Sequence, residues 1–309
     1  AWLTDGADVH VDGSSSTGVG SLLWTPQKRI VLTTNIEARR LADEEFGRDW
    51  EVESHPWWEK TPPRKGRFAT DFPEDPFADL RSPLTPLELR RIRDLGELAT
   101  ASLHSLLTRL PFRGESEHQV AGALSSSLRC LGVQVPVLLV ASDGRIARYR
   151  HPVPTTKKID RLLMVAACPR RHGLTVALTR LVYYGKRLPP ALRRKHDAVC
   201  RVDAALHAAT APGQRWCDIL KVGIQVYRET GYADEWKLHH QGGPVGYEGR
   251  EFKATPTERR QVVEAQAVGW NPSITGTKSE DTILSSGEPL TGPREWPTCG
   301  TRPDILCRA

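Results

Sequence analysis

The sequence predicts an α+β protein with two domains, and three observations lead to this fold class. Amphipathic helical segments alternate with pairs of apolar strands, a pattern typical of helices packed against antiparallel strands. A segment rich in proline and aromatic residues, 56–86, separates the N-terminal part of the chain from the rest. The 309 residues are 39% apolar, which is enough to bury a core. We therefore predict an N-terminal domain at 1–82 and a C-terminal domain at 83–309.

The N-terminal part predicts a small α/β domain. Alternating apolar residues indicate strands at 9–11, 20–24 and 29–34. Asn35 follows the last of these strands and has the side chain of a helix cap, so we expect a helix over 36–45.

The C-terminal part predicts four helices and several strand pairs. Leucine and isoleucine recur at helical intervals after Pro86 and stop before Pro111, and Glu115 opens a second helical pattern that ends before Gly132. Buried strands and tight turns are indicated between these helices and the next two. The expected strands are 133–140, 162–167, 174–184 and a group around Pro272 and Gly276, and the later helices are 191–210 and 216–230.

Charge and cysteine content exclude several classes of protein. The net charge is +6, from 43 Lys and Arg against 37 Asp and Glu, and the two signs are interleaved, so we expect no nucleic-acid partner. The longest apolar run, near 135–141, is too short to span a membrane. The six cysteines form no Cys-x-x-Cys pair, and the first residues lack the layout of a secretory signal, which favours a cytoplasmic protein with free thiols.

Several short segments of the C-terminal part resemble one family in their order and spacing. Together they cover about residues 86–292 and are similar to the creatinase, prolidase and methionine aminopeptidase family. The resemblance implies the pita-bread fold for the C-terminal domain, and the first 80 residues resemble the smaller domain that creatinases and prolidases carry in front. The matching segments are 150–155, the turn at 170–173 with 178–180, Gly185, 239–247, Glu251, 271–272, 279–282 and 289–291.

The same resemblance implies that the metal centre of the family is degenerate here. Peptidases of the family hold two metal ions with two Asp, one His and two Glu, because hard dications need several anionic oxygens. Four of these five positions have lost their ligand, and only Glu280 is retained. We therefore expect no metal and no cofactor. The degenerate positions are Ala166, Ala177, Gly243 and Asn271.

Creatinase itself, as the resemblance implies, hydrolyses a small guanidino compound without metal by using His and Glu. A neutral histidine can accept a proton from water near pH 7. His151 is then a proton shuttle or substrate donor, although a histidine packed before Pro152 would give the same pattern. Glu280 is a general base, a counter-charge for a cationic substrate, or half of a structural ion pair with Lys278. The predicted catalytic residues are His151, His240, Glu280 and Glu251.

The predicted substrate-binding residues surround these. Because His239 and His240 are adjacent, a strand would direct them to opposite faces, so we expect at most one to reach the site. Arg180 is expected to orient a neighbouring carboxylate, and Asn271 to donate a hydrogen bond where the family holds metal. The full set is His239, Tyr247, Arg180, Asn271 and Lys278.

Three hypotheses about function follow. The first is a metal-independent hydrolase that acts on a small amide, guanidino or peptide-like substrate. The second is a non-catalytic pseudoenzyme that binds peptides or proteins, and the third is a residual metallo-aminopeptidase or prolidase. The resemblance also implies a homodimer, and the expected ligand is a small molecule or peptide, with no membrane partner.

Overall fold

The computed structural model describes residues 1–11, 15, 17–59, 69 and 77–309. Contacts divide the chain into two compact units, residues 1–77 and 78–309. Much of the predicted proline-rich connection, and part of the loop at 12–18, lies outside the described residues.

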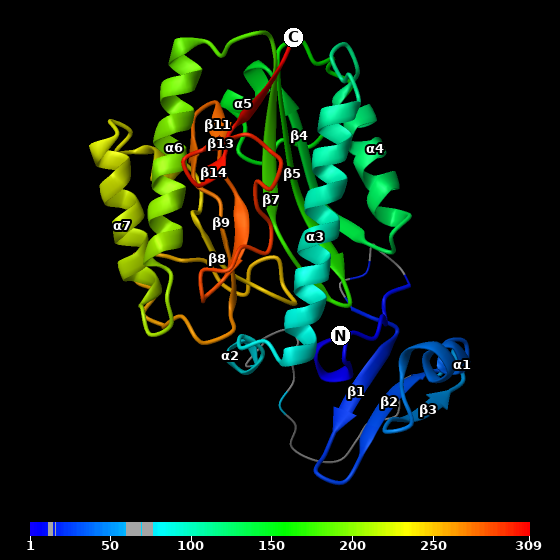
Figure 1. Cartoon of the computed structure of the whole chain (residues 1–309). Helices are drawn as coiled ribbons and strands as arrows, with labels where there is room; N and C mark the ends of the chain where they lie inside the picture. Colours follow the sequence, from blue (N-terminus) through cyan, green and yellow to red (C-terminus); the bar gives the residue numbers. More distant parts are fainter. Residues whose placement is uncertain (12–14, 16, 60–68, 70–76) are drawn as a thin grey trace. The chain divides into compact units, whose positions relative to one another are not determined.

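The first unit is built on a three-stranded sheet (Figure 1). β1 (Gly20–Trp24) pairs antiparallel with β2 (Arg29–Thr34), and β2 pairs parallel with β3 (Glu51–His55). Three short helical elements accompany the sheet: η1 (Trp2–Thr4), α1 (Ala38–Arg40) and the π-helical turn η2 (Leu41–Glu45). Ala7, Val31, Leu41 and Phe46 form the core of this unit.

Two expectations for this unit are wrong. Residues 9–11 form no strand, and only a single backbone bond, from Val19 N to Val9 O at 2.8 Å, joins them to the start of β1. Asn35 caps no helix, because its Oδ1 accepts from the backbone N of Trp57 at 2.8 Å and α1 begins later, after Glu37.

The second unit contains a five-stranded sheet in the order β15-β7-β5-β4, with β6 paired to β5. Its strands are β4 (Gln134–Ser142), β5 (Leu162–Arg171), β6 (Leu174–Thr175), β7 (Leu178–Tyr184) and β15 (Ile305–Arg308). β15 runs parallel to β7 and the other pairs are antiparallel. Two long helices, α3 (Pro86–Arg109) and α4 (Glu117–Arg129), pack against this sheet (Figure 1).

Both helices begin at capping boxes. In α3 the Thr85 side chain accepts from Glu88 N at 3.3 Å, and Glu88 accepts from Thr85 N at 2.7 Å. Ser116 and Gln119 repeat this exchange at the start of α4. The reciprocal bonds satisfy backbone N–H groups that a helix start leaves unpaired, which fixes where each helix begins.

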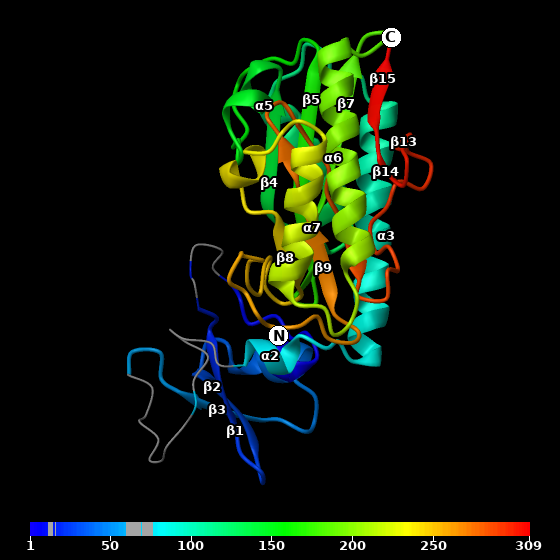
Figure 2. The ribbon, with the colours of Figure 1, turned by 90° about the vertical axis from the view of Figure 1, so that its left-hand side faces the viewer.

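A second sheet has the strand order β12 (Asp281–Leu284), β9 (Ala267–Trp270), β8 (Gly242–Val245). Two short strand pairs join β10 (Ser273–Ile274) to β11 (Thr277–Lys278) and β13 (Thr298–Cys299) to β14 (Arg302–Pro303). The helices α6 (Pro190–Ala209) and α7 (Trp216–Glu229) lie side by side (Figure 2). Helix α6 also packs on β9, β10, β11 and β14. Trp216 and Trp270 are fully buried at the centre of this core. The remaining elements are α2 (Ala78–Arg81), α5 (Gly144–Arg148) and η3 (Glu235–Leu238).

Among the described residues, no helix has both the length and the apolar character needed to cross a lipid bilayer.

Candidate functional site

Two of the degenerate metal positions lie on the five-stranded sheet. Ala166 on β5 is paired with Thr179 on β7, and Ala177 directly precedes β7. Ala166 and Ala177 are both buried. The backbone of Ala177 is held by Thr282, whose hydroxyl accepts from Ala177 N at 2.8 Å and donates to Ala177 O at 2.9 Å. Methyl groups thus stand where the family resemblance implies two aspartates.

The third position, Gly243, is closed to any side chain. A Cβ at this position would lie 2.2 Å from the carbonyl oxygen of Phe252, well inside van der Waals contact. The conformation of Gly243, with φ of +158°, also disfavours other residues. The backbone therefore has no room for the ligand histidine that the resemblance implies here.

The retained carboxylate, Glu280, is bound by the side chains of this chain. Its Oε2 accepts from Lys278 Nζ at 2.7 Å and from Thr179 Oγ1 at 2.5 Å. Its Oε1 accepts from the Arg250 guanidinium at 3.3 Å. The side chains of Lys278 and Glu280 are 8% and 4% exposed, so this is a buried cluster with two positive charges and one negative charge.

These contacts keep Glu280 ionised. Burial by itself would raise the pKa of Glu280, but the charges of Lys278 and Arg250 and the hydrogen bonds from Lys278 and Thr179 outweigh it, so the pKa is lowered. A carboxylate with a lowered pKa and two bound cations is a weak proton acceptor. The residues at the family's metal positions therefore do not fit a pair of dications, because one carboxylate remains and two cationic side chains already bind it.

The fourth position, Asn271, has one unusual feature. Its side-chain Oδ1 is buried and has no hydrogen-bond partner within the described parts of the chain. Its backbone N donates to Gln241 O at 2.9 Å. An unpaired buried acceptor costs free energy, so this oxygen is available to a donor that enters the site.

Arg180 is fully buried and its contacts favour a structural role. Its guanidinium donates to Asp281 at 3.1 Å, to the carbonyl of Gly292 at 2.8 Å and to the ring of His104 at 2.7 Å.

The contacts of Glu251 and Tyr247 also favour structural roles. Glu251 accepts two bonds from Arg81, at 2.9 and 2.7 Å, and bonds from the backbone N atoms of Tyr247 and Glu248. Tyr247 donates to Glu88 at 2.5 Å, which ties this loop to the start of α3.

The three predicted histidines do come together. The Nε2 atoms of His151 and His239 lie 2.9 Å apart, and the rings of His239 and His240 have centroids 4.3 Å apart. One ligand nitrogen from each of the three rings lies within 4.8 Å of the other two. We call His151, His239 and His240 the histidine cluster.

The expectation that His239 and His240 point to opposite faces is wrong. They do not lie on a strand, because η3 ends at Leu238 and β8 begins at Gly242. Their rings are tilted by only 31° relative to each other. The alternation rule requires extended backbone on both residues within a strand, and this connection is irregular.

An ion pair beside the histidine cluster positions it. Arg150, next to His151, donates to Glu235 at 2.7 Å, and Glu235 lies in the helical turn that leads to His239. Glu235 also accepts from the backbone N and the hydroxyl of Thr275, both at 2.9 Å. Gln241 donates to the carbonyl of His239 at 2.6 Å and accepts from Tyr227 at 2.9 Å. Segments 88 residues apart in sequence are thereby brought into contact.

All three histidines of the cluster are neutral near pH 7. Burial and the charge of Lys278 lower the pKa of His239 to about 2 and also lower that of His151. Burial and the charge of Arg250 lower the pKa of His240 to about 4. A neutral imidazole offers a free lone pair, so each ring can act as a hydrogen-bond acceptor or a metal ligand.

A pocket of about 300 Å³ lies next to the histidine cluster. His239 and His240 line it together with two lysines, Lys237 and Lys253, and none of the described residues that line it is acidic. The apolar part of the wall comes from Leu220, Trp236, Leu238, Ala254 and Pro256. This composition suits a small molecule with an apolar body and an anionic group.

Sequence reasoning did not assign roles to three residues of this region. Arg250 directly precedes Glu251, in the place of the histidine in the family's His-Glu pair, and this departure could have pointed to it. Glu235 and Gln241 carried no comparable signal, because their importance comes from contacts with residues distant in sequence.

Comparison with known proteins defines the class of protein. The sequence model of metallopeptidase family M24 matches residues 90–286, which is well over half of the chain. The chain belongs to this family, and the predicted resemblance is confirmed. No curated protein matches the sequence.

Solved structures of low sequence identity share the fold. The Xaa-Pro dipeptidase from Bacillus anthracis has a TM-score of 0.74 and 17% identity, over 96% of this chain and 91% of that one. The prolidase from Pyrococcus furiosus has a TM-score of 0.73 and 18% identity, over 92% and 90%. The N-terminal domain of FACT complex subunit SPT16 from chickpea has a TM-score of 0.63 and 12% identity, over 85% and 80%. The predicted pita-bread fold is therefore confirmed.

Proposed function

We propose that this peptidase-family chain binds a small peptide-like acid and does not hydrolyse it by the two-metal mechanism. The observation that carries the proposal is the binding of Glu280 by Lys278, Arg250 and Thr179. A two-metal peptidase needs this carboxylate for its cations, and here two cationic side chains bind it. The closed backbone at Gly243 adds to this, because no side chain fits there.

The pocket beside the histidine cluster supports the choice of ligand. Lys253 is exposed and lines the pocket, so it can pair with a ligand carboxylate. Leu220 and Trp236 offer apolar contact to the body of the ligand. That the related structures include a prolidase and an Xaa-Pro dipeptidase makes small peptides the first class of ligand to test.

The experiment has a hydrolysis arm and a binding arm. Hydrolysis of X-Pro dipeptides is measured with added Mn²⁺ and Co²⁺, and we expect no turnover. Metal-dependent turnover with two ions per chain would contradict the proposal.

Binding of the same dipeptides is measured by calorimetry. Lys253→Ala should weaken binding about tenfold by removing one charge-assisted bond. Lys186→Ala, on an exposed residue outside the pocket lining, is the matched control and should leave binding unchanged. If Lys253→Ala and Lys186→Ala bound the dipeptides with equal affinity, the pocket beside the histidine cluster would not be the binding site.

A second candidate function is metal-independent hydrolysis by the histidine cluster. The 2.9 Å contact between His151 and His239 favours it, since paired imidazoles can relay a proton. Against it, the low pKa values of His239 and His240 make them weak bases at neutral pH. Turnover of creatine-like or amide substrates without metal, lost in His151→Ala, would favour this candidate over simple binding.

A further inference from the structure

The described side chains offer one cluster with the composition of a metal site, and it is not the family's centre. The positions that the resemblance assigns to the family's centre are occupied by two alanines, a glycine, an asparagine and a carboxylate bound to cations. The histidine cluster lies on different residues, between the end of α5 and the start of β8. We propose that His151, His239 and His240 bind a single zinc-like divalent ion with nitrogen ligands.

The geometry carries this proposal. A tetrahedral Zn²⁺ with Zn–N bonds of about 2.0–2.1 Å places its ligand nitrogens about 3.4 Å apart. In this structure one ligand nitrogen from each ring already lies within 4.8 Å of the other two.

Unused donor atoms are the second observation. The Nδ1 atoms of His239 and His240 are buried, and neither has a hydrogen-bond partner in the described structure. A buried nitrogen without a partner has lost its bonds to water and gained none in exchange. An ion bound through these two Nδ1 atoms would give each of them a partner.

The surroundings hold the three rings in place. Arg150 and Glu235 join the two segments that carry His151 and His239, and Gln241 holds the backbone of His239. Neighbours of this kind, which orient ligands without contacting the ion, increase metal affinity in other proteins. The site is therefore preorganised by bonds that do not involve the ligand nitrogens.

Nearby positive charge limits which ion and which fourth ligand suit the site. Lys278 and Arg250 share the negative charge of Glu280, and exposed Lys253 is screened by water. Imidazole ligands suit Zn²⁺, Cu²⁺ and Ni²⁺, whereas Mn²⁺ and Mg²⁺ prefer carboxylate oxygens. The remaining positive charge favours an anionic fourth ligand, such as hydroxide, chloride or a carboxylate from the pocket.

The test measures metal binding and not activity. The full chain is freed of metal with a chelator and titrated with Zn²⁺, and we expect one equivalent to bind. Binding should weaken by about 100-fold or more in His151→Ala and in His240→Ala, since loss of a ligand exceeds the 10–100-fold typical for an outer neighbour. His118→Ala, on an exposed histidine of α4, is the matched control and should bind as the wild type does.

A Co²⁺ spectrum gives a second readout. Intense visible absorption at one equivalent, absent in His151→Ala, would support a low-coordinate nitrogen site. Binding that is equal in the cluster variants and in His118→Ala, or no stoichiometric binding at all, would overturn the proposal. Two equivalents that disappear in Glu280→Gln would instead contradict the proposed function and place the ions on other residues.

Discussion

Glu280 with Lys278, Thr179 and Arg250 forms what we call the Glu280 cluster. This cluster and the histidine cluster lie in the same unit but differ in how the hydrogen-bonding capacity of their polar atoms is satisfied. In the first, both oxygens of Glu280 receive bonds from Lys278, Thr179 and Arg250. In the second, the buried Nδ1 atoms of His239 and His240 have no hydrogen-bond partner in the part of the chain that the structure describes. The difference shows that the one acid of the first cluster is neutralised by internal cations, whereas the second cluster keeps buried nitrogens that have no partner among the described residues.

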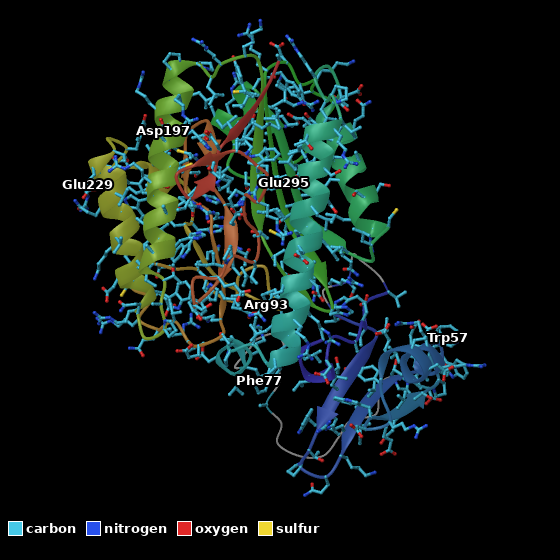
Figure 3. All side chains as sticks on the ribbon, viewed as in Figure 1. Trp57, Phe77, Arg93, Asp197, Glu229 and Glu295 are labelled. Carbon is cyan, nitrogen blue, oxygen red and sulfur yellow. The ribbon has the colours of Figure 1, made fainter. Side chains whose placement is uncertain are left out.

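The buried charges around Glu280 also differ from an ion pair on the surface in how much each charge depends on its partner. Arg93, labelled on α3 in Figure 3, pairs with Glu288 at 2.7 Å, but both side chains are more than 40% exposed. Exposed pairs of this kind contribute little, because water solvates each charge when the other is absent. Inside the Glu280 cluster water cannot do this, so each charge depends on its partners.

The largest expected effect comes from breaking the Glu280 cluster. Lys278→Met leaves the buried Glu280 carboxylate with the neutral bond from Thr179 and with Arg250, at 3.3 Å, as its remaining cation. Removal of one partner of a buried ion pair costs about 3–5 kcal/mol. We expect this loss in the free energy of unfolding measured with urea.

Lys237→Met is the control for this change. Lys237 also pairs with an acid, Asp234 at 2.7 Å, but its side chain is 60% exposed. Its substitution should leave the urea midpoint nearly unchanged. Equal midpoints for the two variants would show that Lys278 does not stabilise Glu280.

The features of the second unit that the sequence predicted are those that depend on residues close together in the sequence. The helices after Pro86 and the strands of the second unit follow from local periodicity, and most were placed within a few residues. The pairing of Lys278 with Glu280 was among the alternatives, because the two residues are neighbours in sequence. Arg250 was not assigned to Glu280, because thirty residues separate them and only the folded β8–β9 region brings them together.

The histidine cluster shows the same limit. Each histidine was a candidate on its own, but the contact of His151 with His239 depends on the ion pair between Arg150 and Glu235. No local pattern encodes a contact across 88 residues. The expectation that His239 and His240 point to opposite faces failed for a related reason, since an irregular connection has no fixed side-chain alternation.

A smaller loss of stability should follow from adding a side chain at Gly243, where the neighbouring backbone leaves no room for one. Gly243→Ala places a Cβ 2.2 Å from Phe252 O and strains the backbone, and overpacking of this kind costs about 1–3 kcal/mol. Gly249→Ala is the matched control, because a Cβ there meets nothing within 4 Å. Urea unfolding of both variants tests this. If Gly243→Ala were as stable as Gly249→Ala, a histidine could be restored there and the position would not be closed.

The smallest expected effect tests a neutral histidine whose ring is already satisfied. His104 accepts from Arg180 at 2.7 Å, unlike the buried nitrogens of the histidine cluster, and burial together with the charges of Arg180 and Arg294 lowers its pKa to about 3. The unfolded chain takes up a proton near pH 6.5 and the folded chain does not, so this contribution to stability is complete above pH 6.5 and is lost as the pH falls toward 3. In His104→Gln, where an amide oxygen can still accept from Arg180, the drop in unfolding free energy between pH 7 and pH 4.5 should be smaller than in the wild type. The other histidines with low pKa values are present in both proteins, so the difference between the two drops reports on His104 alone. An equal drop in the two proteins would mean that His104 takes up its proton as readily when folded as when unfolded, and that the charge of Arg180 does not reach it.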